Sequence, residues 1–140
     1  MIQQTELADE LARLGLFADL DAPQLEAVAH VFDEQWFEQG ARILRQHVSG
    51  SGFYVILDGE VAVRLDGQDV ATLGTGDFFG EVSALLGEPP VADIVALRPV
   101  RCLHLGAPQL HEFLVGHPTV LYRMFLDQTR RLRNADRWRR

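Results

Sequence analysis

The chain has 140 residues, 47% of them hydrophobic, which suits one globular domain with a buried core and leaves no apolar run of 18 residues for a membrane span. Its formal charge is −7, and residues 1–129 carry seven arginines against nineteen acidic residues. An acidic body repels polyanions, so the composition argues against general nucleic-acid binding, and against DNA as a partner without a further domain.

The first thirty residues predict two short helices. Apolar residues at helical spacing predict a first amphipathic helix that stops near Gly15; they are Leu7, Leu11 and Leu14. The motif Asp21-Ala-Pro predicts a second helix, with Asp21 as its N-cap and Pro23 in its first turn.

From about residue 31 to residue 106 the pattern changes to short strands separated by turns. Ten of the twelve glycines lie between Gly40 and Gly106. Asp66-Gly67 predicts a tight hairpin, and Gly74-Thr-Gly76 another turn. The β-rich runs are Phe53–Leu57, Val61–Leu65, Val91–Leu97 and Val100–Leu105. Many short strands at this spacing predict an antiparallel, jelly-roll-like β-roll.

After Pro108 the pattern returns to helix. It predicts one short helix over 108–114 and a longer one that starts at His117-Pro118 and continues to about Arg133. A heptad-like seam with one polar interruption follows the second helix: Leu121, Phe125, Gln128, Leu132 and Ala135. Such a seam packs either on its own β-roll or on the same helix of a second chain, and we favour a homodimer. The expected fold class is mainly β with flanking helices, in one domain over 1–140, with C-terminal helices over about 108–135.

Several segments together resemble a known family. They are Leu16–Leu20, Gly40 before Ile43-Leu44, Phe53–Val61, and Gly76-Asp-Phe-Phe-Gly-Glu81. In this order, and followed by two helices, they resemble the cyclic nucleotide-binding domain of the catabolite activator protein and of the protein kinase A regulatory subunit. The resemblance covers about Leu14 to Arg133. It implies a non-catalytic regulatory or sensor domain that binds cAMP or cGMP.

The resemblance also implies a phosphate cassette, which opens with Phe79-Gly80-Glu81. In the family's pattern the backbone amides of Gly80–Val82 hold the cyclic phosphate, and Glu81 accepts the ribose 2′-hydroxyl. Glycine lets the backbone approach closely, and a carboxylate is a strong acceptor. Glu81 has an alternative interpretation as a cap of the short helix that follows Gly80.

The end of the cassette departs from the family's pattern. Pro90 stands where the family has an arginine, and Val91 stands where a small hydroxylated residue is common, whereas Ala92 matches. An arginine would clamp the phosphate with two charge-assisted hydrogen bonds, and proline supplies neither charge nor N–H. Taking about 3–5 kcal/mol for a buried charge left unpaired, we expect affinity to fall by about 10²–10⁴.

The last helix departs as well. The positions that reach the purine in the family match about Ala135 and Asp136, and Ala135 has no side-chain hydrogen-bonding group. Arg131, one turn earlier, is a candidate substitute cation. The predicted ligand-binding residues are therefore Phe79, Gly80, Glu81, Val82, Pro90, Val91, Ala92 and Arg131.

Other function classes fit the sequence less well. The loss of the arginine also suits an interaction module that has lost nucleotide binding, or the sensor part of a transcription regulator without its DNA-binding domain. A cupin-like metal site would need a His-x-His pair, which is absent, and no Ser-His-Asp or Cys-His signature is recognisable, so we expect no metal and no enzyme activity. The lone cysteine, Cys102, excludes an internal disulfide, and Met1–Arg13 lacks the basic start of a secretion signal. Both features favour a cytoplasmic location.

Overall fold

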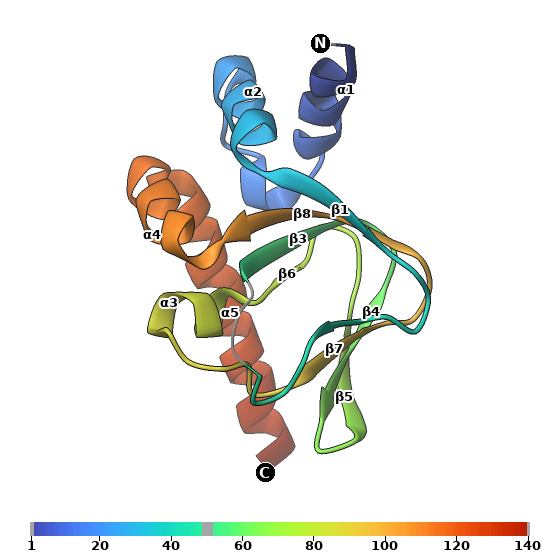
Figure 1. Ribbon diagram of the computed structural model, residues 1–140. Helices are drawn as coiled ribbons and strands as arrows, with labels where there is room; N and C mark the ends of the chain where they lie inside the picture. Colours follow the sequence, from blue (N-terminus) through green and yellow to red (C-terminus); the bar gives the residue numbers. More distant parts are fainter. Residues whose placement is uncertain (1, 49–51, 140) are drawn as a thin grey trace.

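The computed structural model describes the backbone of residues 2–48 and 52–139 and the side chains of residues 6–48 and 52–134. Two four-stranded antiparallel sheets face each other, with strand orders β1-β8-β3-β6 and β2-β7-β4-β5 (Figure 1). The strands are β1 Asp33–Phe37, β2 Arg42–Leu44, β3 Gly52–Asp58, β4 Val61–Leu65, β5 Gln68–Leu73, β6 Phe78–Phe79, β7 Asp93–Ala96 and β8 Val100–Gly106. The expected fold class, a β-roll with flanking helices, is confirmed.

The helices lie around this β-roll. Helices α1 and α2 cover the outer side of the β1-β8-β3-β6 sheet, and the long α5 passes along one end of the roll (Figure 1). Their bounds are α1 Ile2–Leu11, the 3₁₀ helix η1 Gly15–Phe17, α2 Ala22–Val31, α3 Glu81–Leu86, α4 Ala107–Gly116 and α5 Pro118–Arg139.

The local sequence signals explain several element boundaries. Asp21 caps α2 as predicted, because its Oδ1 accepts from the Gln24 N–H at 2.9 Å while the Gln24 side chain accepts from the Asp21 N–H. Helix α1 ends at Leu11, earlier than the expected stop near Gly15, because the amides of Arg13 and Leu14 bond to carbonyl oxygens three residues earlier instead of four. At the other end of the chain, α5 continues to Arg139, six residues beyond the expected end.

The predicted hairpin joins β4 to β5. Leu65 pairs with Gln68, so the loop consists of Asp66 and Gly67 alone. Both loop residues have positive φ, 51° and 82°, which is the condition for a type I′ turn. The Asp-Gly pair tolerates this geometry, and its twist matches that of the strands, so the sequence signal was sufficient here.

The core has two layers, and β3 is buried between them. Phe53, Val55 and Leu57 face the helices, in a cluster that includes residues of α1, α2, η1, α4 and α5. Tyr54 and Ile56 face the other sheet. Burial of both faces explains why this strand is a continuous apolar run instead of an alternating one.

The short strand β6 leads directly into α3 and sets its position. Tyr54 pairs with Phe79, and the two rings stack with centroids 4.9 Å apart. Gly80 then turns the chain with φ +87°, and a Cβ atom at this position would lie 2.2 Å from the carbonyl oxygen of Gly52. Glycine is therefore required at this close approach between two segments of backbone.

Candidate functional site

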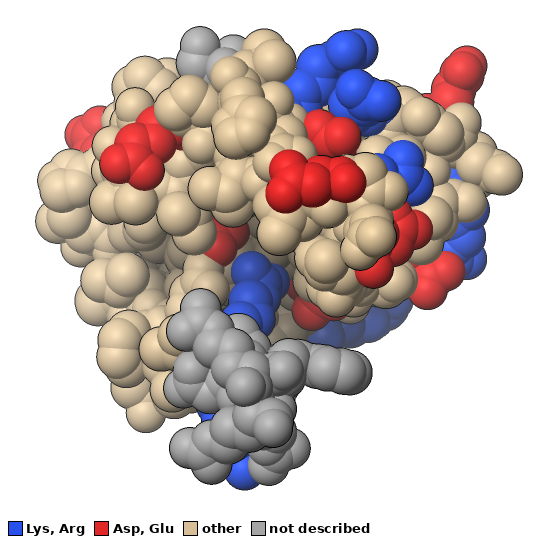
Figure 2. Space-filling model, turned by 90° about the horizontal axis from the view of Figure 1, so that it is seen from below, with Lys and Arg blue, Asp and Glu red and all other residues tan. Residues whose placement is uncertain are grey.

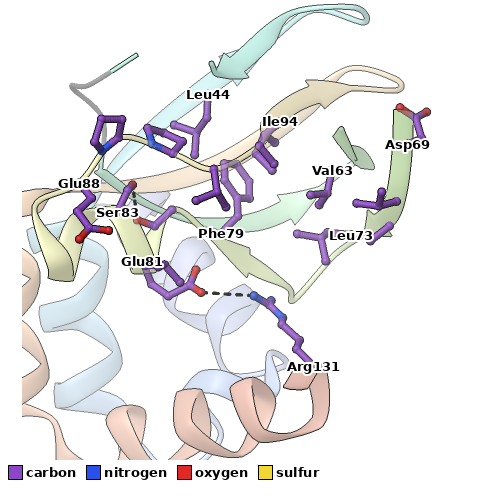
Figure 3. Close-up of a pocket in the computed structure, with 18 of the residues that line it drawn as sticks. Leu44, Val63, Asp69, Leu73, Phe79, Glu81, Ser83, Glu88, Ile94 and Arg131 are labelled. Atoms are coloured by element: carbon purple, nitrogen blue, oxygen red, sulfur yellow. Dashed lines mark hydrogen bonds and ion pairs between the residues drawn. The ribbon is translucent and has the colours of Figure 1, made fainter. Parts of the chain in front are cut away.

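An open cavity of about 940 Å³ lies between the β2-β7-β4-β5 sheet, α3 and α5 (Figure 3). All eight predicted site residues line it, which brings the two ends of the cassette and the last helix together. Sequence reasoning missed the apolar wall on the sheet: Leu44, Val63, Val70, Ala71, Leu73 and Ile94. The signal for Val63 was its place in an alternating strand, and Ile94 lay in the predicted run Val91–Leu97. The other wall residues come from β2 and β5, which have no alternating apolar pattern.

The described residues around the cavity carry more negative than positive charge. Asp69, Glu81 and Glu88 contribute carboxylates, and Arg131 contributes the one cation among the described lining residues. Asp69 already pairs with Arg64 at 2.7 Å, at the far edge on β5 (Figure 3). In the view from below, arginine atoms lie in a hollow with carboxylate atoms on either side of them (Figure 2). This balance disfavours an anionic ligand compared with a cassette that has its own arginine.

Glu81, the first residue of α3, has a side chain that is only 6% exposed. Its Oε2 accepts a hydrogen bond from Nε2 of Gln128 and lies 3.5 Å from Nη1 of Arg131. Burial raises the pKa of this carboxyl above its ordinary value, while its own backbone amide, Arg131 and Gln128 act in the lowering direction. Glu81 lies in the first turn of α3, where a carboxylate interacts favourably with the helix dipole, so a helix-terminal role and a contact with a ligand are both open to this side chain.

Arg131 reaches the cassette from α5 (Figure 3). Its Nη2 donates to the Phe78 carbonyl oxygen at 2.7 Å, and its Cζ lies 4.4 Å from the centre of the Phe78 ring. The guanidinium is therefore already bound to Phe78 and to Glu81. Ala135 and Asp136, the expected purine positions, have side chains that lie outside the described residues.

Gln128 is the contact that sequence reasoning did not assign to the site. In the sequence it appeared as a polar interruption of an apolar seam, and in the structure it donates to Glu81 while Phe125 and Leu132 are exposed. The polar residue within the seam was the available signal. Its partner lies 47 positions earlier in the chain, so the contact depends on tertiary packing.

The end of the cassette is fixed to the loop after β2. The buried Pro90 accepts a hydrogen bond on its carbonyl oxygen from the His47 N–H at 2.9 Å, and Asp93 Oδ1 accepts from the Gln46 N–H at 2.7 Å. Val91 is 69% exposed and still contributes to the cavity wall. Proline thus occupies a structured position in the site and brings no cation to it.

Other candidate sites find little support in the part of the chain that the structure describes. No three His, Cys, Asp or Glu residues there are grouped so as to hold a metal ion. On β8, His104 bonds to Asp33 Oδ1 at 3.1 Å. Cys102 is fully buried between the sheets, and burial raises the pKa of its thiol to about 12. None of the described helices is long and apolar enough to span a bilayer.

Comparisons with known proteins identify the family. The family model of the cyclic nucleotide-binding domain matches residues 34–117. The cGMP-dependent protein kinase egl-4 of Caenorhabditis briggsae is 32% identical over 105 residues, which is 71% of this chain and 14% of the kinase. The chain thus spans a small part of that relative.

Two solved structures extend the comparison. The catabolite activator protein of Thermus thermophilus is 29% identical with a TM-score of 0.76, over 86% of this chain and 59% of that one. The regulatory subunit of a cAMP-independent protein kinase A from Trypanosoma brucei is 29% identical with a TM-score of 0.75, over 88% of this chain and 47% of that one. A triple mutant of the trypanosome protein is bound to cAMP in its A site; in it a glutamate becomes alanine, a threonine becomes arginine and the valine next to that threonine becomes alanine. With the family model matching more than half of its length, the chain belongs to the cyclic nucleotide-binding domain family, as a domain of the regulatory type.

Proposed function

We propose that this chain is a non-catalytic sensor module whose cavity binds cAMP or cGMP weakly, because Pro90 replaces the cassette's arginine. The single observation that supports the proposal most is the charge around the cavity. Three carboxylates line it, and its one described cation, Arg131, is already bound to Glu81 and Phe78. A cyclic phosphate entering this site would meet no free guanidinium among the described lining residues.

The trypanosome relative supports the same reasoning. It is described as cAMP-independent, and its cAMP-bound mutant carries a new arginine followed by a new alanine. Arginine followed by a small residue is what the family's pattern expects at Pro90 and Val91. The functional consequence in this chain is a population shift, in which an occupied cavity favours one placement of α5.

Calorimetric titration with cAMP and with cGMP tests the proposal. We expect a dissociation constant toward the millimolar range for the native chain, and an affinity gain of about 10²–10⁴ for Pro90→Arg. Leu86→Arg is the matched control, because it adds the same charge nearby at an exposed position of α3 that does not line the cavity. It should gain little, since a solvated charge is screened.

Two outcomes would contradict this proposal. Micromolar binding by the native chain would show that the cassette does not need the arginine. Equal affinity for the Pro90→Arg variant and the native chain, with the variant's thermal unfolding unchanged, would show that residue 90 is not the position that faces the phosphate.

A second proposal concerns the assembly of the module. We propose a homodimer through α5, because the apolar residues of its seam are exposed: Leu121, Phe125 and Leu132. Phe125 and Leu132 are 66% and 67% exposed, which is unusual for large apolar side chains that recur on one stripe of a helix. We also propose that the module is cytoplasmic. We propose further that residues 1–140 form one domain.

A further inference from the structure

The C-terminal half of α5 is attached to the β-roll in an unusual way. Near its start, α5 is held by the buried residues Val120 and Met124 and by the two bonds from Arg123 to Asp19, at 2.8 and 3.0 Å. Beyond Met124, the hydrogen bonds and ion pairs that join the described part of α5 to the rest of the protein come from two side chains. These are Gln128 and Arg131, and both reach the cassette.

Both side chains bind Glu81, and Arg131 also binds Phe78, the first residue of β6. Gln128 donates to Glu81, and Arg131 contacts Glu81, the Phe78 carbonyl oxygen and the face of the Phe78 ring. Thr129 and Arg130, between them, bond within α5 instead, to Phe125 and Asp127. The attachment of this half of the helix is therefore concentrated on one carboxylate and one residue of β6.

We propose that Gln128 and Arg131 form a latch that closes the C-terminal half of α5 over the cavity and occupies Glu81 as an internal competitor of the ligand. Both donors contact the same oxygen, Oε2, so a ligand hydroxyl that donates to Oε2 competes with them, and their displacement frees that half of α5. The ligand part of this inference rests on the proposed function, whereas the latch itself is a property of the empty protein.

The latch assigns Arg131 a role different from that of a substitute phosphate cation. A guanidinium that pairs with Glu81 and donates to Phe78 can reach a phosphate only after leaving both partners. If the latch competes with the ligand, removing Arg131 strengthens binding. If Arg131 holds the phosphate, removing it weakens binding. The two roles therefore predict changes of opposite sign for the same variant.

Hydrogen exchange in the ligand-free protein tests the latch first. In Arg131→Ala, amides of residues 125–134 should exchange at least about tenfold faster, the size expected for one lost charge-assisted hydrogen bond, while β3 and β8 keep their protection. Arg131→Lys keeps the charge but not the planar fork, so it should fall between that variant and the native chain. Arg130→Ala is the matched control and should exchange no faster than the native chain in this segment. Unchanged exchange in Arg131→Ala would overturn the latch.

Titration of the same variants with cAMP tests the competition. Arg131→Ala should bind cAMP about tenfold or more tightly than the native chain, in proportion to its faster exchange. Weaker binding by Arg131→Ala would overturn the competitor role. Absence of binding by every variant, Pro90→Arg included, would overturn the proposed function and the competitor role together, and the exchange data would still decide whether the latch exists.

Discussion

The glycine at the start of α3 offers the sharpest test of how the cassette is built. Gly80 and Gly87 lie at the two ends of α3, and both have positive φ, +87° and +68°. A Cβ atom at Gly80 would lie 2.2 Å from the Gly52 carbonyl oxygen, whereas one at Gly87 would meet nothing within 4 Å. Alanine at either position carries the same left-handed backbone strain, and only alanine at 80 adds a clash with backbone.

The two costs can therefore be separated. Gly87→Ala should lower the free energy of unfolding by about 1–2 kcal/mol, the cost of a left-handed residue with a Cβ. Gly80→Ala should lose a further ~1–3 kcal/mol, because β3 and β6 must move apart. Urea unfolding followed by circular dichroism measures both, and the midpoint should fall by about 1 M more for Gly80→Ala. Equal losses in the two variants, within about 0.5 kcal/mol, would refute the argument that the approach to Gly52 requires glycine.

Two further predictions concern α5 and Glu81. If the exposed stripe forms a dimer, sedimentation at micromolar concentration should give the dimer mass for the native chain and the monomer mass for Phe125→Glu. The control is Val115→Glu, which changes an exposed residue of α4 and should stay dimeric. A monomer mass for the native chain would contradict the proposal. Because burial raises the pKa of Glu81, its contribution to stability is fully present below about pH 4.5 and is lost as pH rises through the folded-state pKa. The glutamine of Glu81→Gln does not titrate, so the free energy of unfolding of this variant, relative to that of the native chain, should rise between pH 4 and pH 7. Urea titrations across that range measure the difference. A fall in the relative free energy of unfolding would contradict the direction of the pKa shift.

The sequence predicted best those features that a few neighbouring residues determine. Asp66-Gly67 set the β4–β5 turn, and Asp21 set the start of α2, because each acts on backbone within three residues of itself. The strands β1, β2 and β6 lacked such signals. The side chains of β1 are all exposed or half-buried, and β6 has only two residues. Only the pairing of β1 with β8 and of β6 with β3 makes these segments strands.

The same distinction between local and long-range determinants applies to the candidate site. The motif around Gly80 and the return at Pro90 were visible as spacing, and the structure places both at one cavity. The contact of Glu81 with Gln128 joins residues 47 positions apart, and no local pattern specifies which face of α5 meets α3. The sequence named Arg131 as a residue that could enter the site, and the structure places it in the cavity wall, but the sequence could not show that its partners are the Phe78 carbonyl oxygen and a carboxylate of the site itself.

The two residues that open the cassette differ in how far packing accounts for them. Gly80 is required by the fold, whatever the cavity binds, since any side chain there meets Gly52. Glu81 is the opposite case: among the residues whose side chains the structure describes, it is the one charged residue that is buried, and burial disfavours its ionised form. An apolar side chain of similar size would fill the same space without that cost. The presence of a carboxylate at position 81 therefore needs a partner to explain it, and the competing partners are the latch on α5 and a ligand hydroxyl in the cavity.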